Sequence, residues 1–226
     1  MIVNHALHIA YKDLKTEFRT KQMLNSMIIF SLLVIIIFSF SFADFLTDQD
    51  LITMVAPGIL WISFLFAGML GLSRSFAGEK EEGCLDGLKL CPCERTSLFQ
   101  GKVISSTVLM FIMELFTIPL FIILFDYTIT GIPLLVLVIL LGTLGFMFVG
   151  TLLSALTVNT RTREILLPVL IFPVIIPVII SSVTATSKIL TGAGFANITE
   201  EVQILVIYDI IFFIVAQLVF EYVIED

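Results

Sequence analysis

Apolar residues fill long continuous stretches of this chain, and short polar segments separate them. Six stretches hold at least 19 successive positions with no more than one charged side chain. A helix needs about 20 apolar residues to cross a bilayer, and backbone groups in lipid must pair within their own segment. The stretches lack the alternation of a membrane-spanning strand. The pattern therefore predicts an all-α, polytopic membrane protein with spans at residues 24–43, 51–73, 103–125, 132–156, 165–187 and 202–220.

The composition agrees with this pattern. Of the 226 residues, 58% are hydrophobic and 14% are charged, whereas a soluble domain carries about 25% charged residues. Most of the chain is therefore expected to face lipid or other apolar segments, and residues 1–226 are expected to form a single transmembrane domain. The formal net charge of -7 gives no support for nucleic-acid binding.

Basic residues set the expected orientation. Eleven of the twelve Lys and Arg side chains lie before the first span, between the second and third spans, or between the fourth and fifth. Because cytoplasmic loops accumulate Lys and Arg, both termini and the segment 75–102 are expected to face the cytoplasm, in the plasma (inner) membrane. The segment before the first span is too long for the basic start of a cleavable signal, so that span is expected to be an anchor.

The segment before the first span is predicted to form an amphipathic helix that lies on the inner leaflet. The alternative is a solvated arm that only carries basic residues. His5 and His8 are the only histidines of the chain, and two ring nitrogens do not complete a metal site. Apolar residues recur at helical spacing at positions Val3, Leu7, Ala10, Leu14 and Phe18.

Small residues and prolines distinguish individual spans. Stripes of small residues let a neighbouring helix approach closely, and they occur at Ser63, Ala67 and Gly71 in the second span and at Gly142 and Gly145 in the fourth. Static bends are the favoured interpretation of the prolines in the fifth span, because each removes a backbone donor, and a moving helix is the alternative. These prolines are Pro168, Pro173 and Pro177.

Two carboxylic acids lie inside predicted spans, Glu114 at the centre of the third and Asp209 in the outer half of the sixth. A charge at mid-bilayer is costly, so such residues usually face the interior of the bundle. Glu114 fits a proton site, a polar lining for a substrate or a contact between helices, and equally a neutral acid hydrogen-bonded to a nearby Ser or Thr. For Asp209, which is nearer the interface, the neutral hydrogen-bonded acid is favoured.

The segment 75–102 is the longest polar stretch in the middle of the chain. Its cysteines, Cys84, Cys91 and Cys93, are expected to be reduced thiols in the cytoplasm, and their spacing without a histidine is not a zinc pattern. Glycines and a proline interrupt the stretch, and leucines give it a small apolar face. These features predict one or two short helices that dock a soluble partner, and an ordinary solvated loop is the alternative.

The sequence "EKEEGCLDGLKLCP" followed by "QGK" resembles the loop after the second span of ABC-2-type transporter permeases. Two longer blocks, residues 56–92 and 140–182, resemble the CcmB family, the permease subunit of the cytochrome c maturation (haem exporter) system. The likeness covers most of the chain, and the cysteines and an acidic tail depart from the family pattern. The residues that match the loop are Glu79, Lys80, Glu82, Gly83, Leu85, Leu88, Pro92 and Lys102.

This resemblance implies the membrane subunit of an ATP-binding-cassette system, in which residues 79–92 contact a separate ATPase. The chain has no Gly-x4-Gly-Lys-Ser/Thr motif, so it is expected not to be an enzyme, with ATP hydrolysed by the partner subunit. The family further implies a homodimer with two ATPase subunits, a haem-handling membrane protein and a haem chaperone, with haem as the candidate substrate.

No residue pattern identifies a haem site. Trp61 is the only tryptophan, and no predicted span contains a histidine for axial ligation. Met69 and Met147 are soft ligands in principle, but such methionines more often serve packing. Force transmission is therefore slightly favoured over a fixed haem site. Two alternatives stay open: an ABC-2-type exporter of another substrate, such as a lipid or polysaccharide, and an ATP-independent, proton-coupled carrier that uses Glu114.

The orientation is testable with the three cysteines of the 75–102 segment. We expect Cys84, Cys91 and Cys93 of intact cells to resist a membrane-impermeant maleimide, because the distribution of basic residues places them inside the cell. After lysis they should be labelled. Rapid labelling in intact cells would show that the orientation is inverted.

Overall fold

The computed structural model describes residues 2–42, 49–75, 95–125, 131–158, 160 and 162–223. No strand occurs among these residues, and the predicted all-α class is confirmed. The helices are α1 (Ile2–Thr20), α2 (Gln22–Ser41), α3 (Gln49–Ser75), α6 (Arg95–Leu124), α7 (Ile132–Thr157), α8 (Arg163–Leu190), the short 3₁₀ helix η2 (Phe195–Asn197) and α9 (Thr199–Val223).

Six of these helices, α2, α3, α6, α7, α8 and α9, are long and apolar enough to cross a membrane. This confirms the six predicted spans and a multi-pass membrane protein. The clearest difference concerns α6, which begins at Arg95, whereas the predicted span begins at residue 103. The prediction stopped at Lys102 because a charge usually ends a span, but the Lys102 side chain is buried inside the protein.

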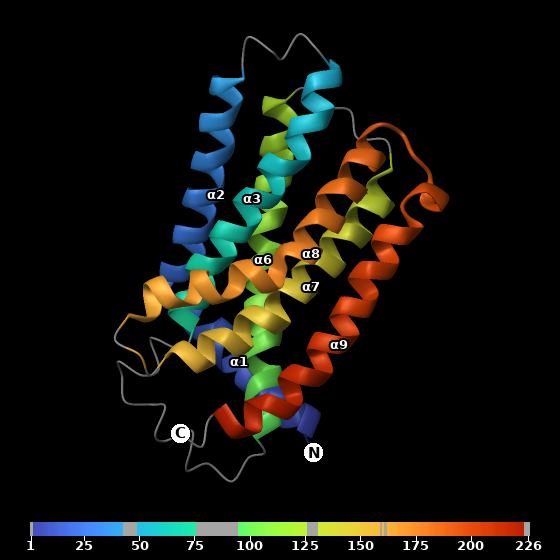
Figure 1. The fold of residues 1–226 in the computed structure, drawn as a ribbon. Helices are drawn as coiled ribbons and strands as arrows, with labels where there is room; N and C mark the ends of the chain where they lie inside the picture. Colours follow the sequence, from blue (N-terminus) through green and yellow to red (C-terminus); the bar gives the residue numbers. More distant parts are fainter. Residues whose placement is uncertain are drawn as a thin grey trace.

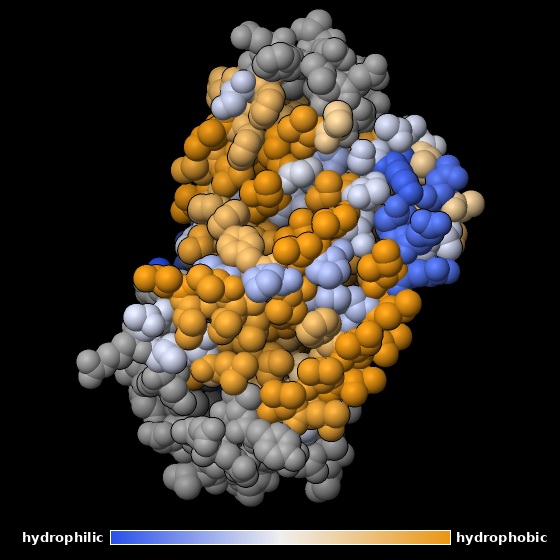
Figure 2. All heavy atoms as spheres, viewed as in Figure 1, coloured by the Kyte–Doolittle hydropathy of each residue, from blue (hydrophilic) through white to orange (hydrophobic). Residues whose placement is uncertain are grey.

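The long helices form a bundle, and α1 lies at the end of the bundle where α9 finishes (Figure 1). Most of the large side chains on the outside are apolar, and several are more than half exposed, among them Phe40 at 77% and Ile123 at 73%. Figure 2 shows apolar residues over most of the visible face, with hydrophilic residues gathered at one edge. Such a surface suits contact with lipid rather than water.

Helix α8 contains Pro168, Pro173 and Pro177 and nevertheless continues from Arg163 to Leu190. Figure 1 shows that its first part crosses the bundle obliquely before the helix turns to run along α7 and α9. A proline removes one backbone hydrogen bond and its ring displaces the preceding carbonyl, which accounts for a bend.

Helix α1 packs along the first half of α6. Ala6 and Ala10 are buried, and a Cβ placed on Gly101 of α6 would lie 2.8 Å from the Ile9 Cβ atom and 2.9 Å from the Ala6 carbonyl oxygen. Leu7 and Phe18 of α1 point away from this contact and are 52% and 48% exposed. The predicted amphipathic helix therefore has one face against protein and a second apolar face outside it.

The small residues singled out in the sequence lie at helix contacts. Ser63 and Ala67 are fully buried, and a Cβ on Gly71 would lie 2.7 Å from the Met27 sulfur of α2. Gly142 faces the Trp61 ring of α3, and Gly145 faces α9. Close approach of neighbouring helices therefore depends on small side chains at these positions and on the absence of one at the glycines.

The contact between α1 and α6 can be tested at Gly101. We expect Gly101→Val to destabilise the protein by about 1–3 kcal/mol, because the added atoms meet the backbone of α1, which cannot rotate away as a side chain can. Thermal unfolding in detergent measures the loss. Gly58→Val is the matched control, since no atom lies within 4 Å of a Cβ at this helical glycine. Equal effects of both substitutions would contradict the close contact.

Candidate functional site

Trp61 connects three helices in the bundle. Its indole Nε1 donates a hydrogen bond to the Thr186 hydroxyl of α8 at 3.0 Å, and its ring lies against Gly142 of α7. The Ser182 hydroxyl of α8 also faces Gly142, with 2.7 Å between its oxygen and a Cβ placed there. The single tryptophan thus has its nitrogen satisfied by a neighbouring helix, as a buried indole generally requires.

Glu114 is buried between α6 and α7. One of its carboxyl oxygens, Oε1, accepts a hydrogen bond from the Thr143 hydroxyl at 2.5 Å, and only 2% of the residue is exposed. The second oxygen, Oε2, has no hydrogen-bond partner among the described residues. The side chain thus joins two helices, as expected both for an interhelical contact and for an acid hydrogen-bonded to threonine.

Asp209 of α9 lies on the other side of α7. Both of its carboxyl oxygens are buried and lack a hydrogen-bond partner among the described residues, so the favoured contact with Ser or Thr is not present there. A Cβ on Gly145 would lie 2.6 Å from Asp209 Oδ1. Because residues two apart on a helix point about 200° apart, Gly145 and Thr143 are on opposite faces of α7. The two acids therefore contact α7 from opposite faces.

Tyr208 links α9 to the bend of α8. Its hydroxyl donates a hydrogen bond to the Val174 carbonyl oxygen at 3.0 Å, and Val174 lies between Pro173 and Pro177. Carbonyl groups near a proline bend are displaced from the regular helical pattern, and the phenol supplies an additional donor at this point. The sequence pattern did not single out Tyr208, because no local spacing relates it to α8.

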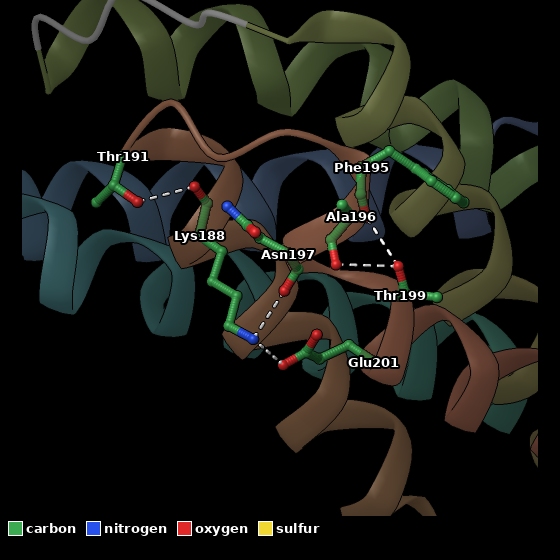
Figure 3. A network of polar contacts seen from close by, with 7 residues as sticks. All are labelled: Lys188, Thr191, Phe195, Ala196, Asn197, Thr199 and Glu201. Carbon is green, nitrogen blue, oxygen red and sulfur yellow. Dashed lines mark hydrogen bonds and ion pairs between the residues drawn. The ribbon is translucent and has the colours of Figure 1, made fainter.

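A polar network fixes the turn between α8 and α9 (Figure 3). The Lys188 ammonium forms an ion pair with Glu201 Oε1 at 2.6 Å and donates to the Asn197 carbonyl oxygen at 3.0 Å. The Thr191 hydroxyl donates to the Lys188 carbonyl oxygen, and the Thr199 hydroxyl donates to the backbone at the start of η2. Lys188 is the one Lys or Arg that the predicted orientation puts outside the cell, and its side chain joins the end of α8 to the start of α9.

At the opposite end of the bundle, Lys102 is buried with an acid of α1. Its Nζ lies 3.0 Å from Asp13 Oδ2 and donates a hydrogen bond to the Ser75 carbonyl oxygen at 3.2 Å. Sequence reasoning matched Lys102 to a transporter loop pattern but did not select Asp13, which reads as one of several polar residues of an amphipathic helix. An isolated base followed directly by a long apolar run is the signal that could have pointed to a buried partner.

The residues predicted to contact an ATPase lie outside the described residues, and so do the three cysteines of the same segment. The predicted contact residues are Glu79, Lys80, Glu82, Gly83, Leu85, Leu88 and Pro92. In the part of the chain that the structure describes, no three His, Cys, Asp or Glu side chains come together as a metal site. Met69 and Met147 are buried within the hydrophobic core.

Comparison with known proteins covers almost the whole chain. The model of the CcmB protein family matches residues 4–225. The chain belongs to the CcmB family. The CcmB match includes both sequence blocks that carry the resemblance and the segment between α3 and α6, so the recognition made from residues 56–92 and 140–182 is confirmed.

Individual relatives agree with the CcmB assignment. Heme exporter protein B of Haemophilus influenzae is 30% identical over 190 residues, covering 83% of this chain and 82% of the relative. Heme exporter protein B of Pseudomonas aeruginosa is 28% identical over 181 residues, covering 80% of each chain. Heme exporter protein B of Escherichia coli K12 is 30% identical over 195 residues, covering 76% and 77%.

The role of Glu114 can be tested by substitution. We expect Glu114→Gln to retain the stability and the activity of the protein, because the amide oxygen can accept the hydrogen bond from Thr143 with a similar shape. Glu114→Leu should lower stability by about 1 kcal/mol, since it removes the acceptor. Thr143→Val should lower it similarly, and the two losses should not add. Thermal unfolding and transport at matched protein levels are the measurements.

A proton-coupled carrier predicts a different outcome for the same variants. Glutamine cannot ionise, so a carrier that loads and releases a proton at Glu114 would lose transport in Glu114→Gln while the protein still folds and inserts. That result would show that Glu114 gains and loses a proton during transport, rather than only accepting a hydrogen bond from Thr143.

Proposed function

We propose that this chain is the membrane permease subunit of an ABC transporter that serves c-type cytochrome maturation, in haem export or in the release of a loaded haem chaperone. The observation that carries this proposal is the CcmB family match over residues 4–225, together with relatives named heme exporter protein B over about four fifths of their length. The six apolar helices support a membrane subunit.

The proposed complex contains a separate ATPase on the cytoplasmic side. Residues 79–92 are the proposed contact with that subunit, and they connect α3 to α6. The same proposal places both termini in the cytoplasm and the chain in the plasma (inner) membrane, and it pairs two copies of the chain with two ATPase subunits. A haem-handling membrane protein and a haem chaperone are the further proposed partners.

Contacts between helices support a mechanical role for this subunit. The Ser154 hydroxyl of α7 donates to the Leu72 carbonyl oxygen near the end of α3 at 2.7 Å, and Trp61 joins α3 to α8. A displacement of α3 at the proposed ATPase side would therefore be passed to α7 and α8 through specific hydrogen bonds. Such coupling requires packed elements that move together.

A mechanical role also fits the chemistry of the spans. The histidines of the chain, His5 and His8, both lie in α1 rather than in a spanning helix, so the spans supply no imidazole to hold haem iron. The buried methionines Met69 and Met147 belong to the apolar core. Transmission of force to a haem-carrying partner is therefore the favoured form of the proposal.

The proposal predicts two results that can be measured together. The tagged chain should copurify with an ATPase subunit, and it should restore haem-stained c-type cytochromes in a strain that lacks its CcmB protein. If the chain instead restores the export of a lipid or polysaccharide in a strain that lacks that exporter, and leaves c-type cytochromes unchanged, a different ABC-2-type exporter would be favoured. Absence of any ATPase from the intact complex would contradict the ATP-driven function.

The same system tests the segment before α6. We expect Gly83→Val to leave insertion unchanged but to weaken ATPase association or cytochrome maturation severalfold, because a β-branched side chain restricts the backbone that glycine leaves free. Gly194→Val at the opposite end of the bundle is the control, since no atom lies within 4 Å of a Cβ there. Full function of a protein with both Gly83→Val and Glu82→Ala would make this segment an ordinary loop.

A further inference from the structure

The Lys102 ammonium is almost completely enclosed by protein. The residue is 2% exposed, and a buried charge is tolerated only where other groups compensate for its lost hydration. Asp13 supplies a carboxylate 3.0 Å away, and Ser75 supplies a backbone carbonyl oxygen at 3.2 Å. Asp13 also forms an ion pair with Lys12 at 3.1 Å through its other oxygen. The charge is thus matched by groups from two other helices.

These contacts join the end of α3 to the middle of α1 and to the third turn of α6. Asp13 belongs to α1, Ser75 is the last residue of α3, and Lys102 is the eighth residue of α6. The segment 76–94 leaves α3 at Ser75 and returns to α6 at Arg95. A single ammonium group therefore holds the helix that precedes this segment, the helix that follows it, and the N-terminal helix.

The end of α3 is a suitable place for such a contact. The last four carbonyl groups of a helix have no partner within the helix, and a positive charge is favourable at this end of the helix dipole. In α3, Lys102 binds the Ser75 carbonyl, and Ser154 of α7 binds the Leu72 carbonyl. Side chains of α6 and α7 therefore complete the final turn of α3.

Helix α1 is held to α6 directly beside this point. A Cβ on Gly101, the residue before Lys102, would lie 2.9 Å from the Ala6 carbonyl oxygen of α1. The backbones of α1 and α6 are therefore packed as one unit, and the Lys102 contacts connect that unit to the end of α3. Movement of α3 relative to α6 would have to break the hydrogen bond from Lys102 to the Ser75 carbonyl oxygen or carry α6 and α1 with it.

We propose that Asp13 and Lys102 are positioning residues that couple the end of α3 to α1 and α6. Through them, a displacement of the end of α3 by the ATPase is transmitted into the bundle. This inference rests on the proposed ATP-driven function. Without the pair, α3 could shift at its end while α1 and α6 stay in place. ATP would then be hydrolysed without productive work on the membrane side.

A purely structural ion pair makes a different prediction from a coupling pair. Asp13→Asn removes the carboxylate beside the buried Lys102 ammonium, and Lys102→Met leaves Asp13 with Lys12 as its ion-pair partner. Each single substitution disturbs the balance of buried charge and should lower the amount of folded protein, whether the pair is structural or coupling. The double variant Asp13→Asn/Lys102→Met removes both charges and should recover much of that amount. The two roles differ in what the recovered double variant can still do.

The experiment uses the whole complex with its ATPase, in cells and after purification. For each variant, haem-stained c-type cytochrome is measured at matched complex levels, and ATP hydrolysis is measured on the purified complex. We expect the double variant to hydrolyse ATP at a rate within about twofold of the wild-type rate. Its cytochrome maturation should fall about tenfold, because ATP hydrolysis is then no longer transmitted into the spans. Lys102→Arg, which keeps the charge, should retain maturation.

The ion pair at the other end of the bundle provides the matched control. Lys188→Met/Glu201→Gln removes a pair of similar length, 2.6 Å, between α8 and α9, and it should leave the ratio of maturation to hydrolysis unchanged. Recovery of both readouts by the Asp13/Lys102 double variant, or an equal loss in the control, would overturn the coupling role while the proposed function stands. A wild-type chain that binds no ATPase would overturn both.

Discussion

Lipid offers no hydrogen-bond partner, so each backbone group within the membrane must be paired inside the protein. This constraint makes the six apolar segments helices and leaves unpaired groups only at helix ends and bends. The last turn of α3 shows how the fold responds, because Ser154 and Lys102 bind carbonyl groups that the helix itself cannot satisfy. At the bend of α8, Pro177 removes the helical donor of the Pro173 carbonyl, and the Tyr208 hydroxyl adds a hydrogen bond to the neighbouring Val174 carbonyl.

The same contacts give the bundle its mechanical connections. Helix α3 is tied to α6 and α1 through Lys102, to α7 through Ser154 and to α8 through Trp61. The proposed ATP-driven function needs such continuous links between the end of the bundle proposed to meet the ATPase and the spans. The polar groups that stabilise the fold are therefore also the candidates for transmission, and side chains that bind haem iron are not required for this role.

Sequence reasoning located polar residues correctly but not all of their partners. For Glu114, a hydroxyl partner was one of two equally weighted interpretations, and Thr143 of α7, 29 residues away in sequence, supplies it. For Asp209, a hydrogen bond to Ser or Thr was favoured, but its carboxyl lies against Gly145 and has no hydrogen-bond partner among the described residues. Whether an acid meets a hydroxyl depends on the rotation and depth of two helices, and neither property is encoded in local spacing.

The sequence by itself determined the number of spans and the all-α class, because the length and hydropathy of a span follow directly from the thickness and chemistry of the bilayer. The CcmB family followed from the likeness of two sequence blocks. It placed Lys102 at the edge of a span, where a charge usually meets water. Only the tertiary structure decided that Lys102 is buried beside Asp13 and Ser75. The reason is physical: burial of a charge depends on compensating groups that distant segments bring to it, and packing of α1 on α6 provides them.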